Sequence, residues 1–135
     1  MNIDKILIIA SAVIKNDKNE ILLLKRGETK TFQNHFQLPE GKLEENETPL
    51  NALHREIKEE LGLKIKSTEL KTVSQTEIEA KGIKYLAFRL IYQVILNSIS
   101  KIKLSEEHSE YGWFSEKDFN NLKLLPGTKE AIEKV

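Results

Sequence analysis

The hydrophobic positions at the start of the chain follow the pattern of two strands. Residues 5–14 are almost continuously Ile, Leu, Val and Ala, and such a run favours a buried strand. Residues 16–19, Asn-Asp-Lys-Asn, are typical of a turn, and a second apolar run follows over residues 20–25. Two such runs on either side of a short polar turn predict a β-hairpin.

The clearest helical pattern covers residues 49–61. Thr48 can cap this helix, Pro49 suits its first position, and Gly62 suits a left-handed stop after its last turn. The apolar side chains recur at the spacing of one helical face: Leu50, Leu53, Ile57 and Leu61. We therefore expect an amphipathic helix with this face in the core.

The rest of the chain adds a loop, further strands and two short helices. Residues 27–47 show no clear period and contain glycine and proline, which predicts a long loop. The other expected elements are two long strands joined around residues 80–82, one short strand and two terminal helices: 69–79, 83–96, 111–114, 115–122 and 128–135. This succession indicates an α+β fold in a single domain, residues 1–135, with helices covering a mostly antiparallel or mixed sheet.

Charge and composition narrow the class of partner. The 135 residues carry 21 Lys and Arg against 21 Asp and Glu, so no overall field attracts nucleic acid polymers or membranes. The apolar N-terminal run is too short to cross a bilayer, and the residues before it make a poor basic leader. The absence of cysteine excludes disulfides, thiolate metal sites and thiol nucleophiles. We therefore expect a cytoplasmic protein that binds a small molecule, as a monomer or a homodimer.

The end of the predicted helix gathers Glu56, Glu59 and Glu60. Like charges one turn apart cost roughly 0.2–0.5 kcal/mol, and negative charge at a helix C-terminus adds a similar penalty. A solvated helix can bear these costs, so an exposed acidic face is the simplest interpretation. Two features favour a binding site instead: the acids flank the apolar stripe, and a loop containing Gly41 leads into the helix. Clustered oxygen ligands beside a glycine loop suit a hard divalent cation, Mg²⁺ or alternatively Mn²⁺.

The spacing of these residues resembles the signature of the Nudix hydrolases. Gly41 is followed after five residues by Glu47, and after seven more by the run Arg-Glu-Ile-Lys-Glu-Glu-Leu-Gly-Leu at 55–63. Every defined position of this Nudix box, residues 41–63, is met. Residues 22–26, 36–39 and 107–114 also resemble family segments, so the resemblance covers nearly the whole chain. It implies a Nudix-type α/β/α sandwich with a mixed β-sheet and the box helix packed on it.

One residue departs from the family's pattern. Where members often have Pro-Gly-Gly before the box lysine, this chain reads Pro39-Glu40-Gly41-Lys42. The glycine at the first box position is retained. We expect Glu40 to affect substrate fit more than chemistry.

The resemblance implies that water attacks a phosphorus of a nucleoside diphosphate linked to a further group X. Arg55 would orient the carboxylates of the box, and Glu47 would brace the loop. The implied metal ligands are three carboxylates and one backbone carbonyl: Glu56, Glu59, Glu60 and Gly41.

The general base is left open between the box helix and the loop before the last strand. On the helix, Glu56 or Glu59 can take this role. The loop offers three carboxylates: Glu106, Glu107 and Glu110. We favour Glu107, because it precedes His108 in the family-like Glu-His-Ser-Glu-Tyr pattern. His108 itself is expected to be structural or exposed.

Local positive charge is needed to bind a polyanion in a protein of zero net charge. Arg26 and Lys42 are the candidate phosphate-binding residues, whereas Lys25 is more simply a surface cation. We expect Trp113 and Phe114 to pack in the core. A nucleobase would stack on a loop aromatic, Phe32 or Phe36.

The box indicates the reaction but does not specify the group X. No proline lies between Pro49 and Pro126, unlike the pattern of members that act on ADP-ribose. We expect cleavage of a (deoxy)nucleoside triphosphate to the monophosphate and pyrophosphate, with dinucleoside polyphosphates and nucleotide sugars as alternatives. A non-catalytic nucleotide-sensing module is the rival class, and the intact box carboxylates argue against it.

Overall fold

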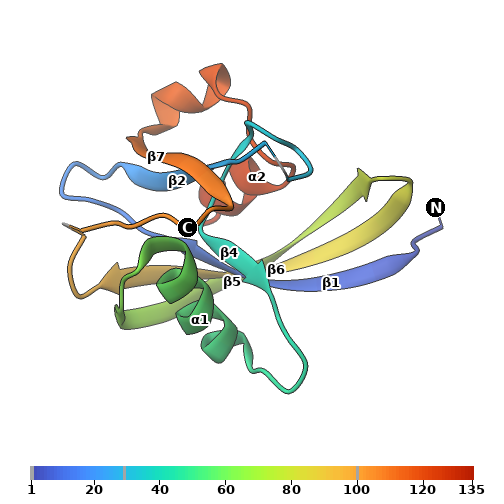
Figure 1. Ribbon diagram of the computed structural model, residues 1–135, viewed down its shortest axis with the longest axis horizontal. Helices are drawn as coiled ribbons and strands as arrows, with labels where there is room; N and C mark the ends of the chain where they lie inside the picture. Colours follow the sequence, from blue (N-terminus) through green and yellow to red (C-terminus); the bar gives the residue numbers. More distant parts are fainter. Residues whose placement is uncertain (1, 29, 100) are drawn as a thin grey trace.

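The structure is a computed structural model that describes residues 2–28, 30–99 and 101–135 (Figure 1). The elements follow in the order β1 (Lys5–Val13), β2 (Ile21–Arg26), β3 (Phe36–Gln37), β4 (Glu40–Lys42), α1 (Pro49–Leu61), β5 (Ile65–Ala80), β6 (Ile83–Leu96), β7 (His108–Phe114), the 3-10 helix η1 (Glu116–Asn121) and α2 (Thr128–Glu133). The α+β class expected from the sequence is confirmed.

The larger of the two sheets is mixed. Its strand order is β4-β1-β6-β5, with β1 parallel to β6 and the other neighbours antiparallel. The smaller sheet, β3-β2-β7, is antiparallel. α1 covers one face of the larger sheet, while α2 lies on the other side, near the smaller sheet (Figure 1). This arrangement is the expected α/β/α sandwich, to which a second sheet is added.

The hairpin expected from residues 5–14 and 20–25 forms only next to its turn, where Leu22 N–H donates to the Ile14 carbonyl at 3.0 Å, and beyond it the two strands enter different sheets. β1 pairs with β6 along one edge, and β4 occupies the middle of its other edge, Ile9 to Ser11. β2 pairs instead with β3 and β7, and a bridge between Lys15 and Ile21 joins its start to the end of β1. The second half of β1 and most of β2 are buried on both faces, which explains their continuous apolar runs.

The segment 27–47, expected as a loop, contains two short strands. β3 pairs with β2, and β4 pairs with β1 so that Glu40 lies opposite Ser11 and Gly41 opposite Ala10. Strands of two and three residues are too short to produce a period in the sequence. The pairing of β4 holds the start of the box beside β1.

The other boundaries are close to those expected. The two long strands joined at residues 80–82 are confirmed, although β5 begins at Ile65, and β7 begins at His108. The segment 115–122 forms a 3-10 helix, and residues 128–133 form α2. β1, β5 and β6 extend together beyond the rest of the molecule as an arm (Figure 1). None of the helices in the described residues is long and apolar enough to cross a membrane.

α1 begins and ends where the sequence predicts. The Thr48 side chain accepts a backbone hydrogen bond from the first turn at 3.2 Å, and Gly62 adopts a left-handed φ of 68°. Leu53 and Ile57 are fully buried, but Leu50 is 43% exposed, so the expected stripe is wrong at this position. Leu50 lies in the first turn, at the margin of a buried face made of Ala52, Leu53, Ile57, Glu60 and Leu61.

Two apolar clusters fill the interior. The first joins α1 to β1, β2 and β6, and the second joins the other faces of β1, β2 and β6 to η1 and α2. Trp113 packs against the first cluster and Phe114 against the second, as expected for core residues.

Candidate active site

The acidic residues of α1 meet the box loop at β4. The carboxyl group of Glu56 lies against the Cα of Gly41, so that a Cβ at position 41 would overlap the Glu56 side chain. A Cβ at position 41 would therefore require the end of the Glu56 side chain to move away from the strand.

Glu60 lies within the buried face of α1, 2% exposed, and not at the edge of the stripe as the sequence suggested. Its Oε1 accepts a hydrogen bond from the Glu40 backbone N–H at 3.3 Å, whereas Oε2 has no hydrogen-bond partner among the described residues. Burial raises the pKa of Glu60 well above its usual value, and the nearby Glu56 and Glu40 carboxyl groups raise it further. A buried carboxylate with a free oxygen is stabilised by a cation.

Arg55 joins α1 to the loop that precedes it. Its Nε donates to Glu47 Oε2 at 2.6 Å and its Nη2 donates to Glu47 Oε1 at 2.9 Å, a bidentate pair. Nη2 also donates to the Lys42 carbonyl at 3.0 Å, and Nη1 donates to Glu56. The hydrogen bond from Arg55 lowers the pKa of Glu47 to about 2. Arg55 thus contacts the loop and the acidic side chains at the same time.

Glu59 stands apart from the buried carboxylates. Its side chain is exposed, and Arg55 Nη1 approaches Glu59 Oε2 at 3.4 Å. In the described part of the chain, no three acidic or histidine side chains converge as a complete set of metal ligands. The donor set nevertheless fits a divalent cation, because a free oxygen of Glu60, the Glu56 carboxylate and the Gly41 backbone lie together.

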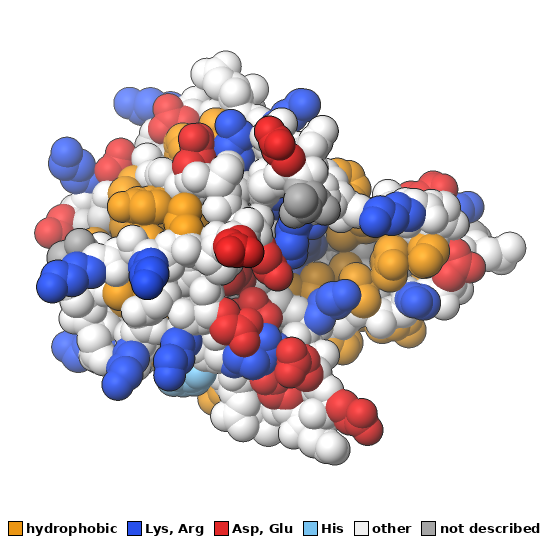
Figure 2. Space-filling model, in the orientation of Figure 1, with side chains coloured by type: hydrophobic (Ala, Val, Ile, Leu, Met, Phe, Trp, Pro, Cys, Tyr) orange, Lys and Arg blue, Asp and Glu red, His pale blue; other side chains and the backbone are white. Residues whose placement is uncertain are grey.

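A cavity of about 610 Å³ lies beside these residues, between the loops and the arm. Figure 2 shows acidic side chains gathered across the middle of one face, with hydrophobic side chains along the arm next to them. The ionisable part of the lining consists of Arg26, Lys30, Glu40, Lys42, Arg89, Glu107 and His108, with Lys81 from the arm. The apolar part comes mainly from β1, β5 and β6: Leu7, Ile9, Ile78, Ala80 and Tyr85.

Arg26 and Lys42, the expected phosphate-binding residues, both line the cavity. Arg26 is held in place by the protein, because its Nε donates to the Thr31 carbonyl at 2.7 Å and its Nη1 donates to Gln37. Burial lowers the pKa of Arg26. Lys42 is exposed. Lys25 does not belong to the described lining of this cavity.

The loop before β7 reaches the same cavity through Glu107 and His108. Glu107 is exposed, and its Oε2 accepts a hydrogen bond from Lys30 Nζ at 3.1 Å. His108 is buried, with Nδ1 3.8 Å from Glu60 Oε2. Burial and the charge of Lys30 lower the pKa of His108 to about 4, so its imidazole is neutral at about pH 7. The loop therefore folds towards the helix end, as a catalytic role for Glu107 requires.

The two aromatic candidates for base stacking have different positions. Phe32 lines the cavity. Phe36 packs edge-on against Phe114, with ring centroids 5.2 Å apart, and contributes to the core. The alternative of Phe36 as the stacking residue is therefore wrong, because β3 directs it into the second apolar cluster. Tyr85, on the arm, was missed by sequence reasoning.

Sequence reasoning also missed Arg89 and Ser11, which are buried beside the box. Arg89 donates to both carboxylate oxygens of Glu40, and Ser11 donates to one of them. The signal for Arg89 is the one charge within residues 85–92, an otherwise uncharged and mostly apolar run of β6, and for Ser11 it is the one hydroxyl within the apolar run of β1.

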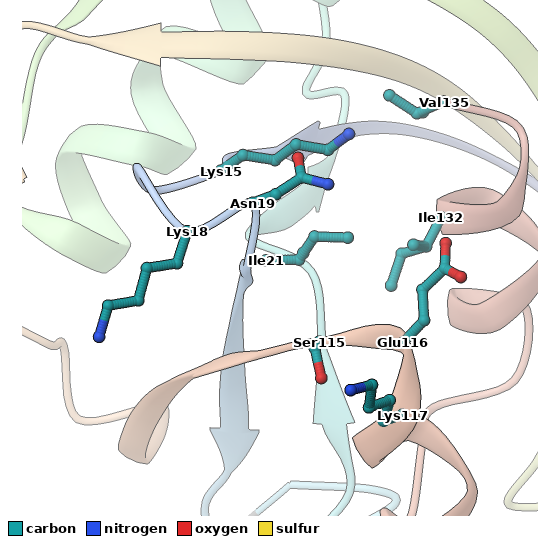
Figure 3. A pocket seen from close by; sticks show the side chains of 9 residues that line it. All are labelled: Lys15, Lys18, Asn19, Ile21, Ser115, Glu116, Lys117, Ile132 and Val135. Atoms are coloured by element: carbon teal, nitrogen blue, oxygen red, sulfur yellow. The ribbon is translucent and has the colours of Figure 1, made fainter.

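A second hollow, of about 370 Å³, lies near α2 and the turn after β1 (Figure 3). Lys15, Lys18 and Lys117 contribute to its described lining, and Glu116 is its single acid. In Figure 3 the Lys18 side chain points away from the other labelled residues. The described lining includes no residue of the box, and its charge does not suit a divalent cation.

Known proteins resemble this chain in sequence. The NUDIX domain family profile matches residues 6–135. An 8-oxo-dGTP diphosphatase of Haemophilus influenzae is 34% identical over 84 residues, covering 62% of each protein. The match therefore spans less than two thirds of that relative. The nucleoside triphosphatase NudI of Escherichia coli O139:H28 is 28% identical over 131 residues, covering 92% of each.

Solved structures show the same fold. The MutT NUDIX hydrolase from Burkholderia pseudomallei is 28% identical and superposes with a TM-score of 0.79, covering 96% of this chain and 98% of the other. The MutT protein from Methanosarcina mazei Go1 is also 28% identical, with a TM-score of 0.76 and coverage of 98% and 94%. Because the family profile extends from β1 to residue 135, the chain belongs to the NUDIX domain family.

Proposed function

We propose that the protein is a divalent-metal-dependent hydrolase that cleaves a (deoxy)nucleoside triphosphate to the monophosphate and pyrophosphate. The observation that carries this proposal is the buried Glu60 carboxylate, with a free oxygen, beside Glu56 and Gly41 and next to a cavity lined by Arg26 and Lys42. The names of two relatives, 8-oxo-dGTP diphosphatase and nucleoside triphosphatase, support the same class of reaction.

The acidic end of α1 is the proposed metal site. Glu56 and Glu60 would hold the cation, Mg²⁺ or Mn²⁺, together with the Gly41 carbonyl, and Glu59 would contribute from the exposed side. A bound divalent cation neutralises charge on the phosphate oxygens and activates water for attack. Arg55 keeps the Glu56 carboxylate next to the box loop through its hydrogen bonds to both.

Hydrolysis requires one proton acceptor in addition to the cation. The water oxygen forms a bond to phosphorus while the bridging P–O bond breaks, and pyrophosphate leaves with the bonding electrons. We assign the water proton to the Glu107 carboxylate, since this residue lines the cavity and its side chain is accessible. Glu56 and Glu59, on the helix, are the alternatives for this role.

The cavity offers separate surfaces for the two ends of a nucleotide. Arg26, Lys30 and Lys42 supply positive charge for the phosphates. Among them Arg26 is preorganised, because its guanidinium is already fixed by hydrogen bonds to the protein. The aromatic rings of Phe32 and Tyr85, with the apolar side chains of the arm, suit a nucleobase.

Product analysis tests this proposal. The protein is incubated with deoxynucleoside triphosphates including 8-oxo-dGTP, with a dinucleoside polyphosphate and with a nucleotide sugar. Each substrate is tested with Mg²⁺, with Mn²⁺ and with a chelator. We expect nucleoside monophosphate and pyrophosphate from a triphosphate, and no product with the chelator.

Other outcomes would contradict parts of the proposal. Release of orthophosphate and a nucleoside diphosphate would refute the assigned bond, and preferential cleavage of the dinucleoside polyphosphate or nucleotide sugar would refute the substrate. Nucleotide binding without turnover of any compound would favour a sensing module.

A further inference from the structure

A buried ion pair links the box to a strand two places away in the larger sheet. Arg89 of β6 is 0% exposed, and Glu40 of β4 is 8% exposed. Arg89 Nε donates to Glu40 Oε1 at 3.1 Å, and Arg89 Nη2 donates to Glu40 Oε2 at 3.3 Å. Ser11, on the strand between them, donates from Oγ to Glu40 Oε1 at 2.7 Å. Both carboxylate oxygens of Glu40 are therefore bound within the protein.

The backbone of Glu40 touches the proposed cation site. Its N–H donates to Glu60 Oε1 at 3.3 Å, and the next residue is Gly41, whose Cα lies against Glu56. Any displacement of residue 40 would therefore change the hydrogen bond to Glu60. The same displacement would move Gly41 relative to Glu56. The side chain of Glu40 faces Arg89 while its backbone supports the metal ligands.

Arg89 has little freedom to move away from Glu40. A Cβ at Gly127 would overlap Arg89 Nη1 and Thr76 Oγ1, so the guanidinium is closely packed on this side. Nη1 has no hydrogen-bond partner among the described residues. The orientation of the guanidinium is thus set by its two bonds to Glu40 and by this packing.

Stability alone does not account for the pair. Removing two charges from water costs several kcal/mol per ion, and apolar residues of similar volume are often at least as stabilising. A glycine before Gly41, which resembles the usual family pattern, would need no charged partner at all. A planar guanidinium does, however, fix a carboxylate at two points, and so restricts the backbone that carries it.

We propose that Arg89, acting through Glu40, is a positioning residue for the cation site, and that it sets the placement of Glu60 and Gly41. The inference rests on the proposed function, in which Glu60 and Gly41 hold the cation.

The test measures binding of Mn²⁺ alone, by electron paramagnetic resonance of the free ion, together with the melting temperature without metal. Arg89→Lys keeps the positive charge but loses the bidentate geometry. The double variant Glu40→Gln, Arg89→Met keeps the summed charge of the pair at zero, so any change in Mn²⁺ binding reflects geometry and not net charge. We expect each variant to weaken Mn²⁺ binding by about 10- to 100-fold, the usual effect of losing a residue that supports a metal ligand.

A lysine on the same strand provides the control. Lys84 of β6 is exposed, and Lys84→Met should bind Mn²⁺ like the wild type. Weakened binding in the double variant at a melting temperature near that of the wild type is the result that distinguishes positioning from packing.

Two results would overturn the proposal. One is Mn²⁺ binding indistinguishable from the wild type in the folded variants. The other is loss of the fold in both variants, which would show that the pair serves stability. Failure of the wild-type protein to bind Mn²⁺ is a different outcome, because it would refute the proposed function on which the inference rests.

Discussion

The Cα of Gly41 and the carboxyl group of Glu56 are in such close contact that a side chain at position 41 would overlap Glu56. This contact places the Gly41 backbone and the Glu56 carboxylate at the same point of the box. Even one methyl group added at position 41 would therefore disturb the acidic site.

Gly41→Ala is therefore expected to weaken Mn²⁺ binding and to lower the hydrolysis rate, because the added methyl group must displace the Glu56 carboxylate. Gly82→Ala is the control: nothing lies within 4 Å of a Cβ there, but φ is +77°. Its left-handed conformation should cost about 1 kcal/mol of stability and leave Mn²⁺ binding unchanged. Unaltered Mn²⁺ affinity in Gly41→Ala would show that Glu56 does not contribute to the site.

The Arg55–Glu47 pair predicts a specific response to acid. The hydrogen bond from Arg55 lowers the pKa of Glu47 from 4.5 to about 2 in the folded protein. The stabilisation is fully present above the unfolded-state value of 4.5 and is lost as the pH falls towards 2. In Arg55→Met the Glu47 pKa should rise towards 4.5, as measured by NMR titration of the carboxyl carbons.

An exposed lysine of the same helix serves as the comparison for this titration. Lys58→Met should leave the Glu47 pKa low, because Lys58 is exposed and no contact between the two residues is described. A Glu47 pKa that stays low in Arg55→Met would mean that another group holds the carboxylate.

Glu60 predicts the opposite dependence on pH. Burial raises its folded-state pKa above 4.5, so the folded state retains a proton that the unfolded state has already released. Without metal, the free energy of unfolding should therefore fall as the pH rises from 4.5 through the folded pKa of Glu60. Glu60→Gln should remove this part of the decrease in the free energy of unfolding, as measured by urea unfolding across the pH range.

Cation binding should offset this loss of stability, because the Glu60 carboxyl group must be deprotonated to bind the cation, and binding therefore releases a proton. Mn²⁺ affinity of the wild type should accordingly rise with pH over the same interval. An affinity independent of pH would argue that Glu60 is not a ligand.

Sequence patterns predicted the features of this fold that depend on residues close together in the chain. Thr48 and Gly62 bound α1 because each acts on a few neighbouring backbone groups, and the apolar spacing gave the buried positions Leu53 and Ile57. The box residues were identified in the same way, by fixed spacing within one loop and one helix. The exposed Leu50 was the exception, because the margin of a helix face depends on what packs against it.

What the sequence did not predict depends on contacts between distant segments. The separation of β1 and β2 into different sheets follows from the pairing of β1 with β4 and β6. Arg89 and Glu40 are 49 positions apart in the chain, and neither belongs to a motif that indicates the other. The burial of His108 beside Glu60 is of the same kind.

Glu107→Gln tests the assignment of the proton acceptor. If Glu107 accepts the water proton, kcat should fall by roughly 10²–10⁴-fold while Mn²⁺ affinity stays nearly unchanged. Glu116→Gln, which removes an exposed carboxylate of η1 outside the described lining of the active-site cavity, is the control and should retain wild-type kinetics. A parallel loss of Mn²⁺ affinity would identify Glu107 as a ligand instead, and unchanged kinetics would pass the role of base to Glu56, Glu59 or Glu110.

The central claim is that the acidic end of α1 binds the cation that hydrolysis requires. The most direct measurement is the rate of pyrophosphate release from a deoxynucleoside triphosphate with Mg²⁺, for the wild type and for the double variant Glu56→Gln, Glu60→Gln. The control Glu77→Gln, Glu79→Gln removes two exposed charges from β5. We predict that wild type and control release pyrophosphate, that chelator abolishes the release, and that the Glu56, Glu60 variant is inactive although its circular dichroism shows a folded protein. Full activity in that variant would contradict the account.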